Sequence, residues 1–166
     1  MAEEISEYRV YEVRCKDVME EEGVRFAGII DESGKLLAGG FKPGVSPLEK
    51  DKEKFNQFLD RVIEISLRHE HKGTLGELNY VACRRDKVVL VSFPFPISKH
   101  LLLVSAEPNV SIEKLAEKIS RSLKNPQEIL ILFKLNMKKI NYQHPFFEHL
   151  KKYNIEWKDL QDYNYF

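Results

Sequence analysis

The sequence predicts an α/β (α+β) fold in which a layer of five short strands lies between helices. A hairpin is expected over residues 24–41, because two apolar strand patterns flank a turn that contains Gly34. Two continuous apolar runs follow at 87–93 and 99–106. Strands without polar alternation are buried on both faces, so helices are expected on both sides of the sheet.

Two helices are expected before the third strand. The first covers residues 6–22. A longer middle helix is expected to begin at Ser46-Pro47-Leu48-Glu49, a capping box in which serine and glutamate satisfy free amides of the first turn. It would run to about Glu70, and its apolar residues cover roughly 200°, wider than the ~100° stripe of a one-sided helix. The flank with Phe58 and Ile65 is therefore left for another contact.

The second half of the chain predicts one edge strand and several helices. The mixed polarity of Leu78–Arg84 suits an edge strand, and residues 111–123 have apolar spacing i, i+3, i+4, i+7, which is helical. A second capping box starts a helix at 126–139, with shorter helices beyond it. The expected division is a domain over residues 6–124 and a helical, aromatic-rich extension over 125–166.

Composition limits the classes of function. The 26 basic and 26 acidic residues cancel, so no overall positive field favours nucleic acid. No apolar run approaches the ~20 residues of a membrane span, and the acidic start lacks a secretory signal. Cys15 and Cys83 are expected to be reduced thiols in a cytoplasmic protein, with Cys83 buried in its strand.

Two segments carry a family resemblance. The stretch Val24–Ala38 combines a strand, Asp31, a turn glycine and a second apolar strand, and Tyr80–Ala106 supplies strands followed by an amphipathic helix. Together they resemble the Roadblock (dynein light chain) superfamily, a relative of the longin and profilin-like folds, over residues 6–124. The resemblance implies a five-stranded antiparallel sheet with the middle helix on one face and the terminal helices on the other.

The resemblance also implies a function in protein binding without catalysis. Members of the superfamily commonly form homodimers through the third strand and the middle helix, and they act as platforms, often beside small GTPases. No cofactor is implied. Carried onto this chain, the dimer or partner surface would include Phe58, Arg61, Ile65, Arg68, Leu78, Tyr80 and Ala82.

No catalytic, cofactor-binding or metal-binding set is expected. His69-Glu70-His71 lacks zinc-binding helical spacing, because side chains at i and i+2 of a helix point apart. A nucleophilic pair of Cys83 with His100 stays open, although nothing in the spacing favours it. The glycine-rich segment 39–44 precedes the expected middle helix but lacks the order of a phosphate-binding loop.

Aromatic residues are concentrated between positions 142 and 166. One interpretation is that this tail packs onto its own domain. The other is a docking segment, because large rigid aromatic side chains are good interface anchors. Stacking on single-stranded nucleic acid, with help from the basic stretch 114–139, is a weaker third interpretation. The anchors of a docking tail would be Phe146, Phe147, Trp157 and Tyr163.

Three functions are therefore compared. The favoured one is a homodimeric interaction platform. The alternative is a small-ligand sensor of PAS-like or profilin-like shape, which a cavity lined by aromatics between sheet and helix would favour. An enzyme is disfavoured because no acid, base and nucleophile converge in the sequence.

Overall fold

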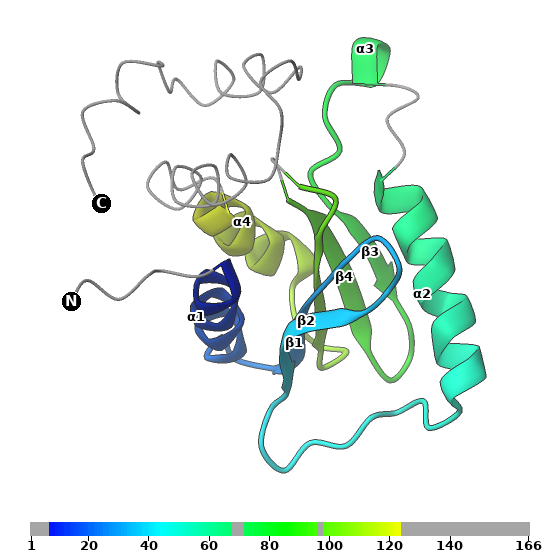
Figure 1. Ribbon diagram of the computed structural model, residues 1–166. Coiled ribbons are helices and arrows are strands. Elements are labelled where there is room, and N and C mark those ends of the chain that lie inside the picture. Colours follow the sequence, from blue (N-terminus) through cyan, green and yellow to red (C-terminus); the bar gives the residue numbers. More distant parts are fainter. Residues whose placement is uncertain (1–6, 68–71, 96–97, 124–166) are drawn as a thin grey trace, which may run out of the picture.

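The computed structural model describes residues 7–67, 72–95 and 98–123, and it contains a five-stranded sheet with helices on both faces (Figure 1). All neighbouring strands are antiparallel and follow the order β2-β1-β5-β4-β3. This confirms the fold class predicted from the sequence. The strands are β1 (Val24–Ile30), β2 (Leu36–Phe41), β3 (Val81–Arg84), β4 (Val89–Pro94) and β5 (Leu101–Ala106).

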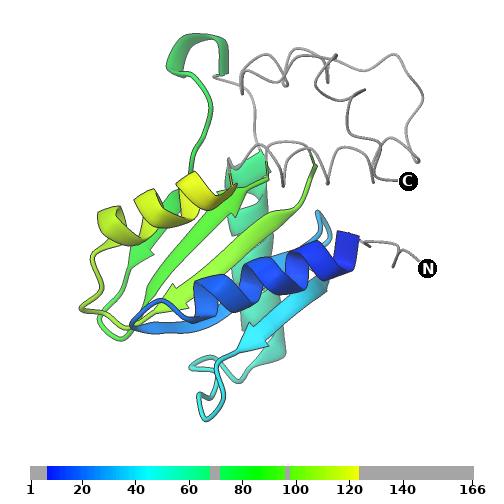
Figure 2. The same ribbon diagram turned by 90° about the vertical axis from the view of Figure 1, so that its left-hand side faces the viewer.

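The helices form two unequal layers. Helices α1 (Glu7–Met19) and α4 (Ile112–Leu123) lie side by side on one face of the sheet, and α2 (Lys52–Leu67) lies on the other (Figure 2). A short helix, α3 (Lys72–Leu75), stands between α2 and β3. The arrangement is the one that the family resemblance implied.

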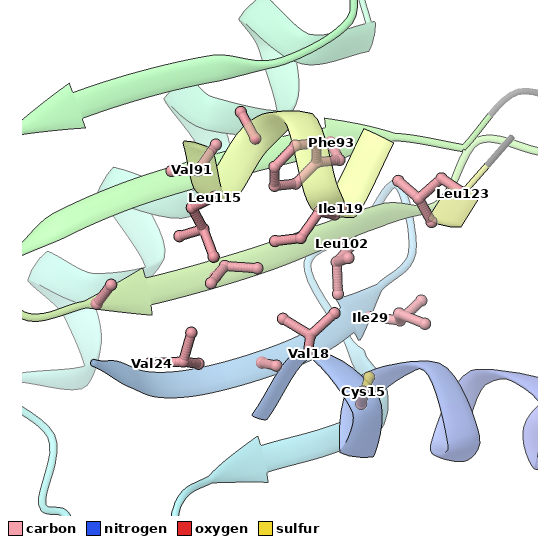
Figure 3. Packing of buried hydrophobic residues seen from close by; sticks show 14 of the residues in the cluster. Cys15, Val18, Val24, Ile29, Val91, Phe93, Leu102, Leu115, Ile119 and Leu123 are labelled. Atoms are coloured by element: carbon pink, nitrogen blue, oxygen red, sulfur yellow. The ribbon is translucent and has the colours of Figure 1, made fainter. Parts of the chain in front are cut away.

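The main core lies between the sheet and the pair α1 and α4 (Figure 3). Phe93 of β4 and Leu102 of β5 are completely shielded from water, and they pack with Leu115 and Ile119 of α4. The apolar spacing of α4 puts these residues on one stripe. Each fully buried side chain of this size contributes roughly 1.5–3 kcal/mol to folding.

Helix α1 buries one stripe of side chains against the sheet. Tyr11, Cys15 and Val18 are buried, whereas Val13 is 52% exposed. The buried set has the spacing i, i+4, i+7 of one helical face. Arg14 is also buried, and its guanidinium donates a hydrogen bond of 3.1 Å to the carbonyl oxygen of Ser122. This bond joins α1 to the last turn of α4, where a cation also compensates the helix dipole.

A second, smaller core holds α2 against the opposite face. Leu59 and Ile63 of α2 pack there with Ile30 and Leu101. Leu101 and Leu102 are adjacent residues on β5, and both are completely buried. Successive side chains of a strand point to opposite faces, so this pair shows that the centre of the sheet is covered from both sides.

The start of α2 differs from the prediction. The helix begins at Lys52, and the Asp51 carboxylate accepts hydrogen bonds from the amides of Glu53 at 3.0 Å and Lys54 at 3.3 Å. Asp51, not Ser46, is therefore the N-cap. Ser46 lies in the connection before the helix, where its carbonyl oxygen accepts a hydrogen bond from Arg25. The glycine-rich segment 39–44 consequently does not lead into a helix N-terminus, and the phosphate-loop interpretation fails.

The third strand is shorter than predicted. It begins at Val81, which pairs with Ser92, and not at Leu78. Helix α3 was not predicted; Gly76, with φ of +82°, follows its last residue. The chain therefore turns before it can pair with β4. The helices expected from residue 126 onward, and the extension 125–166, lie outside the described residues. No helix of the described ranges is long and apolar enough to cross a membrane.

Gly39 should be the glycine least tolerant of substitution. A Cβ atom there would lie 2.1 Å from the backbone oxygen of Ala27 and 2.9 Å from Sγ of Cys15, whereas one at Gly44 would meet nothing within 4 Å. Both residues have positive φ, so both alanine variants share the backbone strain. We expect Gly39→Ala to lose about 1–3 kcal/mol more unfolding free energy than Gly44→Ala. Urea denaturation measures the difference, and equal losses would contradict the packing described.

Candidate interaction surface

Strand β3 forms one exposed edge of the sheet. It pairs with β4 on one side, and within the described ranges no strand pairs with its other side. Ala82, Cys83 and Arg84 are all exposed. The Arg84 guanidinium donates hydrogen bonds to the carbonyl oxygens of Pro108 and Val110, which ties this edge to the connection before α4.

The two cysteines occupy opposite environments. Cys15 is buried, and burial raises the pKa of its thiol to about 12. Cys83 is exposed, so the expectation of a buried thiol was wrong. The reason is that β3 is a short edge strand whose own face is only partly covered. Cys83 sits opposite Leu90 in the ladder.

The possible Cys83–His100 nucleophilic pair is not formed. Cys83 lies near the β3–β4 turn, whereas His100 lies at the far end of β4, where its carbonyl oxygen accepts a hydrogen bond from the amide of Phe95. His100 Nδ1 is 2.6 Å from the Tyr11 hydroxyl oxygen. The imidazole therefore contributes to the packing between α1 and the sheet.

Helix α2 presents one face to the sheet and another to water. Leu59, Ile63 and Ser66 are buried against the sheet. The Ser66 and Ser92 hydroxyl oxygens are 2.8 Å apart in a buried hydrogen bond that fixes α2 on β4. Ile65 is 55% exposed, which leaves a large apolar side chain of α2 in water.

The predicted partner-surface residues divide into three groups. Arg61, Ile65 and Ala82 are exposed, and Leu78 is 38% exposed. Phe58 and Tyr80 are half-buried, and the Tyr80 ring lies 6.0 Å from that of Phe93, against its own core. Lying outside the described residues are Arg68 and the four tail anchors Phe146, Phe147, Trp157 and Tyr163.

A groove lies between the N-terminal half of α2, the sheet and the connection 42–51. Its volume is about 570 Å³, within the ~300–1,000 Å³ of small-molecule sites. Apolar side chains predominate in the lining. They include Leu48, Val62 and four phenylalanines, which are Phe26, Phe41, Phe55 and Phe58. The groove arises because the connection carries the chain past the end of the sheet before α2 returns over it.

Charged side chains surround this apolar lining. Lys54 belongs to the first turn of α2, and Arg85 and Lys87 belong to the β3–β4 turn. Within the described ranges, none of these three cations forms a side-chain hydrogen bond or ion pair. Glu49 and Asp86 are the acidic residues of the lining. No local sequence pattern predicts the groove, because its walls come from separate elements.

Metal-binding groups do not cluster in the described part of the chain. No set of three histidine, cysteine, aspartate or glutamate side chains there is arranged to hold an ion. His69 and His71 lie outside the described residues.

Solved structures share this architecture at low sequence identity. MglB of Myxococcus xanthus aligns with a TM-score of 0.55 at 11% identity, covering 87% of this chain and 100% of that one. A Roadblock/LC7 domain from Streptomyces avermitilis aligns with a TM-score of 0.51 at 12% identity, covering 72% and 97%. An MglB described with a tetrameric arrangement aligns with a TM-score of 0.51 at 13% identity, covering 69% and 87%.

The sheet order and the two helical layers define a Roadblock-type fold, as the similar structures show. The sequence profile that matches residues 2–132 is described as a family of unknown function, DUF6659, and the chain belongs to that family. No curated protein matches the sequence. The comparisons therefore establish the fold and the family.

The Asp51 N-cap fixes the start of α2, which forms one wall of the groove. Its contribution to stability can be tested directly. We expect Asp51→Ala to lower the unfolding free energy by about 1 kcal/mol, because the amides of Glu53 and Lys54 lose their acceptor. Ser46→Ala is the matched control and should stay within about 0.5 kcal/mol of the parent. Chemical denaturation followed by circular dichroism measures both. A larger loss at Ser46 would restore the capping box as the helix start.

Proposed function

We propose that this protein is a non-catalytic interaction platform that pairs with a second copy through the side formed by α2 and β3. The observation that carries the proposal is the position of an unpaired sheet edge beside an exposed apolar face of a helix. Such an edge is a template for another strand. Exposed apolar surface next to it supplies the free energy for association.

The geometry of β3 suits symmetric pairing. Val81–Arg84 pairs with β4 without a register shift, so the other side of the strand offers backbone groups to a second copy. Two β3 strands related by a twofold axis would join the two sheets in an isologous interface. The exposed Ala82 places a small side chain at this edge.

Helix α2 would supply the second contact. Ile65 is 55% exposed, and Arg61 lies one turn before it on the outer surface. Packing two α2 helices across the axis would remove Ile65 from water. Phe58 and Leu78 extend the apolar surface at its margins. Tyr80 contributes to the core next to β3 and not to the pairing surface, because its ring packs against Phe93.

The partner beyond the second copy is proposed to be a protein, with a small GTPase as the class that the superfamily resemblance indicates. The tetrameric arrangement of the similar MglB belongs to that protein, and it supports self-association as a property that this fold can carry. A non-catalytic role is supported by the separation of Cys83 from His100 and by the structural hydrogen bond of His100 to Tyr11.

Charge placed on the pairing surface should separate the copies. We expect Ile65→Glu combined with Ala82→Asp to convert dimers into monomers, because carboxylates would be forced together across the axis. Val13→Glu, on the 52% exposed position of α1, is the matched control and should remain dimeric. Sedimentation velocity over a range of concentrations measures the change. A monomeric parent, or a double variant that stays dimeric, would contradict the proposed surface.

Cys83 provides an independent distance measurement. In a symmetric pairing of two β3 strands, the two Cys83 residues lie within roughly 14 Å. A short bis-maleimide should therefore link two chains in the parent but not in Cys83→Ser. Cys15 is buried and should not contribute. Absence of linked chains in a dimeric sample would show that the copies meet elsewhere.

The groove is the observation that favours the second candidate, a small-ligand sensor. It has the volume and phenylalanine lining of a ligand pocket. If that function holds, an apolar carboxylate such as decanoate should raise the melting temperature of the parent. Phe55→Asp should abolish the rise, and Leu36→Asp, on an exposed position outside the lining, should retain it. No rise with any chain length would remove this candidate.

A further inference from the structure

The groove leaves three large apolar side chains partly exposed to water. Phe41 of β2 is 40% exposed, Leu48 of the connection is 53% exposed, and Phe55 of α2 is 41% exposed. All three line the same groove. Contiguous exposed apolar surface marks a binding site in a stable domain. An apolar occupant of the groove would remove these side chains from water.

The charges at the groove restrict the kind of occupant. Lys54, Arg85 and Lys87 have no side-chain partner in the described part of the chain. Arg25 also lines the groove, although its guanidinium is already bound to Glu107 at 2.9 Å. An occupant that carries carboxylates among its apolar side chains would complement these cations.

The segment 156–166 of the same chain has both properties. Its sequence is EWKDLQDYNYF, which supplies four aromatic residues and one leucine in eleven positions. It contains Glu156, Asp159 and Asp162 against the single Lys158, so its side chains sum to −2. Aromatic residues fit a phenylalanine-lined groove, and the excess of carboxylates fits the cations of its rim.

The segment can reach the groove from where α4 ends. The described chain ends at Leu123 on the opposite face of the sheet. Residues 124–155 provide 32 intervening positions, which span up to about 100 Å when extended. A domain of this size has a radius of gyration of roughly 13 Å. The length is therefore ample for a path around the sheet.

We propose that segment 156–166 binds in the groove of its own domain and shields the apolar side chains there. The segment then acts as an internal ligand, and any other molecule that uses the groove must displace it. The proposal does not require pairing between copies. Phe58, Val81 and Cys83 belong both to the groove lining and to the proposed pairing surface, but Phe41 and Leu48, which the test uses, lie outside that surface.

The chain carries its own reporter for this contact. Trp157 is the only tryptophan in the sequence, so the tryptophan fluorescence of the full chain reports on this segment. We expect the parent to show blue-shifted emission and weak quenching by acrylamide. Phe41→Asp and Leu48→Asp should each shift the emission to the red and raise the quenching constant severalfold. Lys54→Glu should act in the same direction, most clearly at low salt, because salt screens the charge contact.

The matched control is Leu36→Asp. Leu36 is 47% exposed on the same strand as Phe41 but does not line the groove, so its variant should leave the emission unchanged. Leu48 lies in the connection, and its variant keeps the test valid if Phe41→Asp unfolds the sheet. Circular dichroism verifies that each variant is folded.

Three results would overturn the proposal. A water-exposed Trp157 in the parent would show that the segment does not bind the domain. A shielded Trp157 that responds to none of the groove variants would place the segment elsewhere. A shielding that disappears on dilution would assign the segment to a second copy.

Discussion

The structure depends on one constraint, which is that the central strands are apolar on both faces and must be covered twice. Leu101 and Leu102 express this constraint most simply, because they are neighbours on β5, are both fully buried, and belong to different cores. Helices α1 and α4 cover one face with a continuous stripe of apolar side chains. Helix α2 alone must cover the other. The fold follows from this requirement. The two faces of the sheet are covered unequally, because two helices pack on one face and one helix packs on the other.

The unequal coverage leaves exposed apolar surface on the α2 side of the sheet. One helix cannot shield the full width of five strands, so an exposed flank of α2 and a phenylalanine-lined groove remain on the side where β3 forms the edge of the open sheet. Helix α2, strand β3 and the connection 42–51 therefore lie together on one side of the protein. The proposed binding role rests on this region, because exposed apolar side chains and an unpaired strand edge occur there together.

Much of the fold could be predicted because its signals are local and periodic. The hairpin was marked by its turn, where the Asp31 carboxylate accepts hydrogen bonds from Ser33 and Lys35, and α4 was marked by its apolar spacing. The start of α2 was predicted wrongly, because Ser46-Pro47-Leu48-Glu49 has the pattern of a capping box. In the structure the helix begins at Lys52, and the Asp51 carboxylate accepts the hydrogen bonds of its first turn. The length of β3 likewise depends on its ladder with β4.

The candidate site was less predictable, because its parts come together only in three dimensions. The exposed flank with Ile65 could be inferred from the wide apolar arc of α2, and the edge position of β3 from its mixed polarity. The groove could not be inferred, since its lining combines Phe26 and Phe41 from the hairpin with Phe55 from α2. Cys83 was expected to be buried because its neighbours are apolar, yet an edge strand leaves it exposed.

Hydrogen exchange of the full chain as a function of protein concentration tests the central claim most directly. If α2 and β3 form the pairing surface, amides of Val81–Arg84 and of the Ile65 turn should exchange more slowly in concentrated than in dilute solution. Those of α1 should not change. Concentration-dependent protection confined to α1 or α4, or no change anywhere in a sample that associates, would contradict the account.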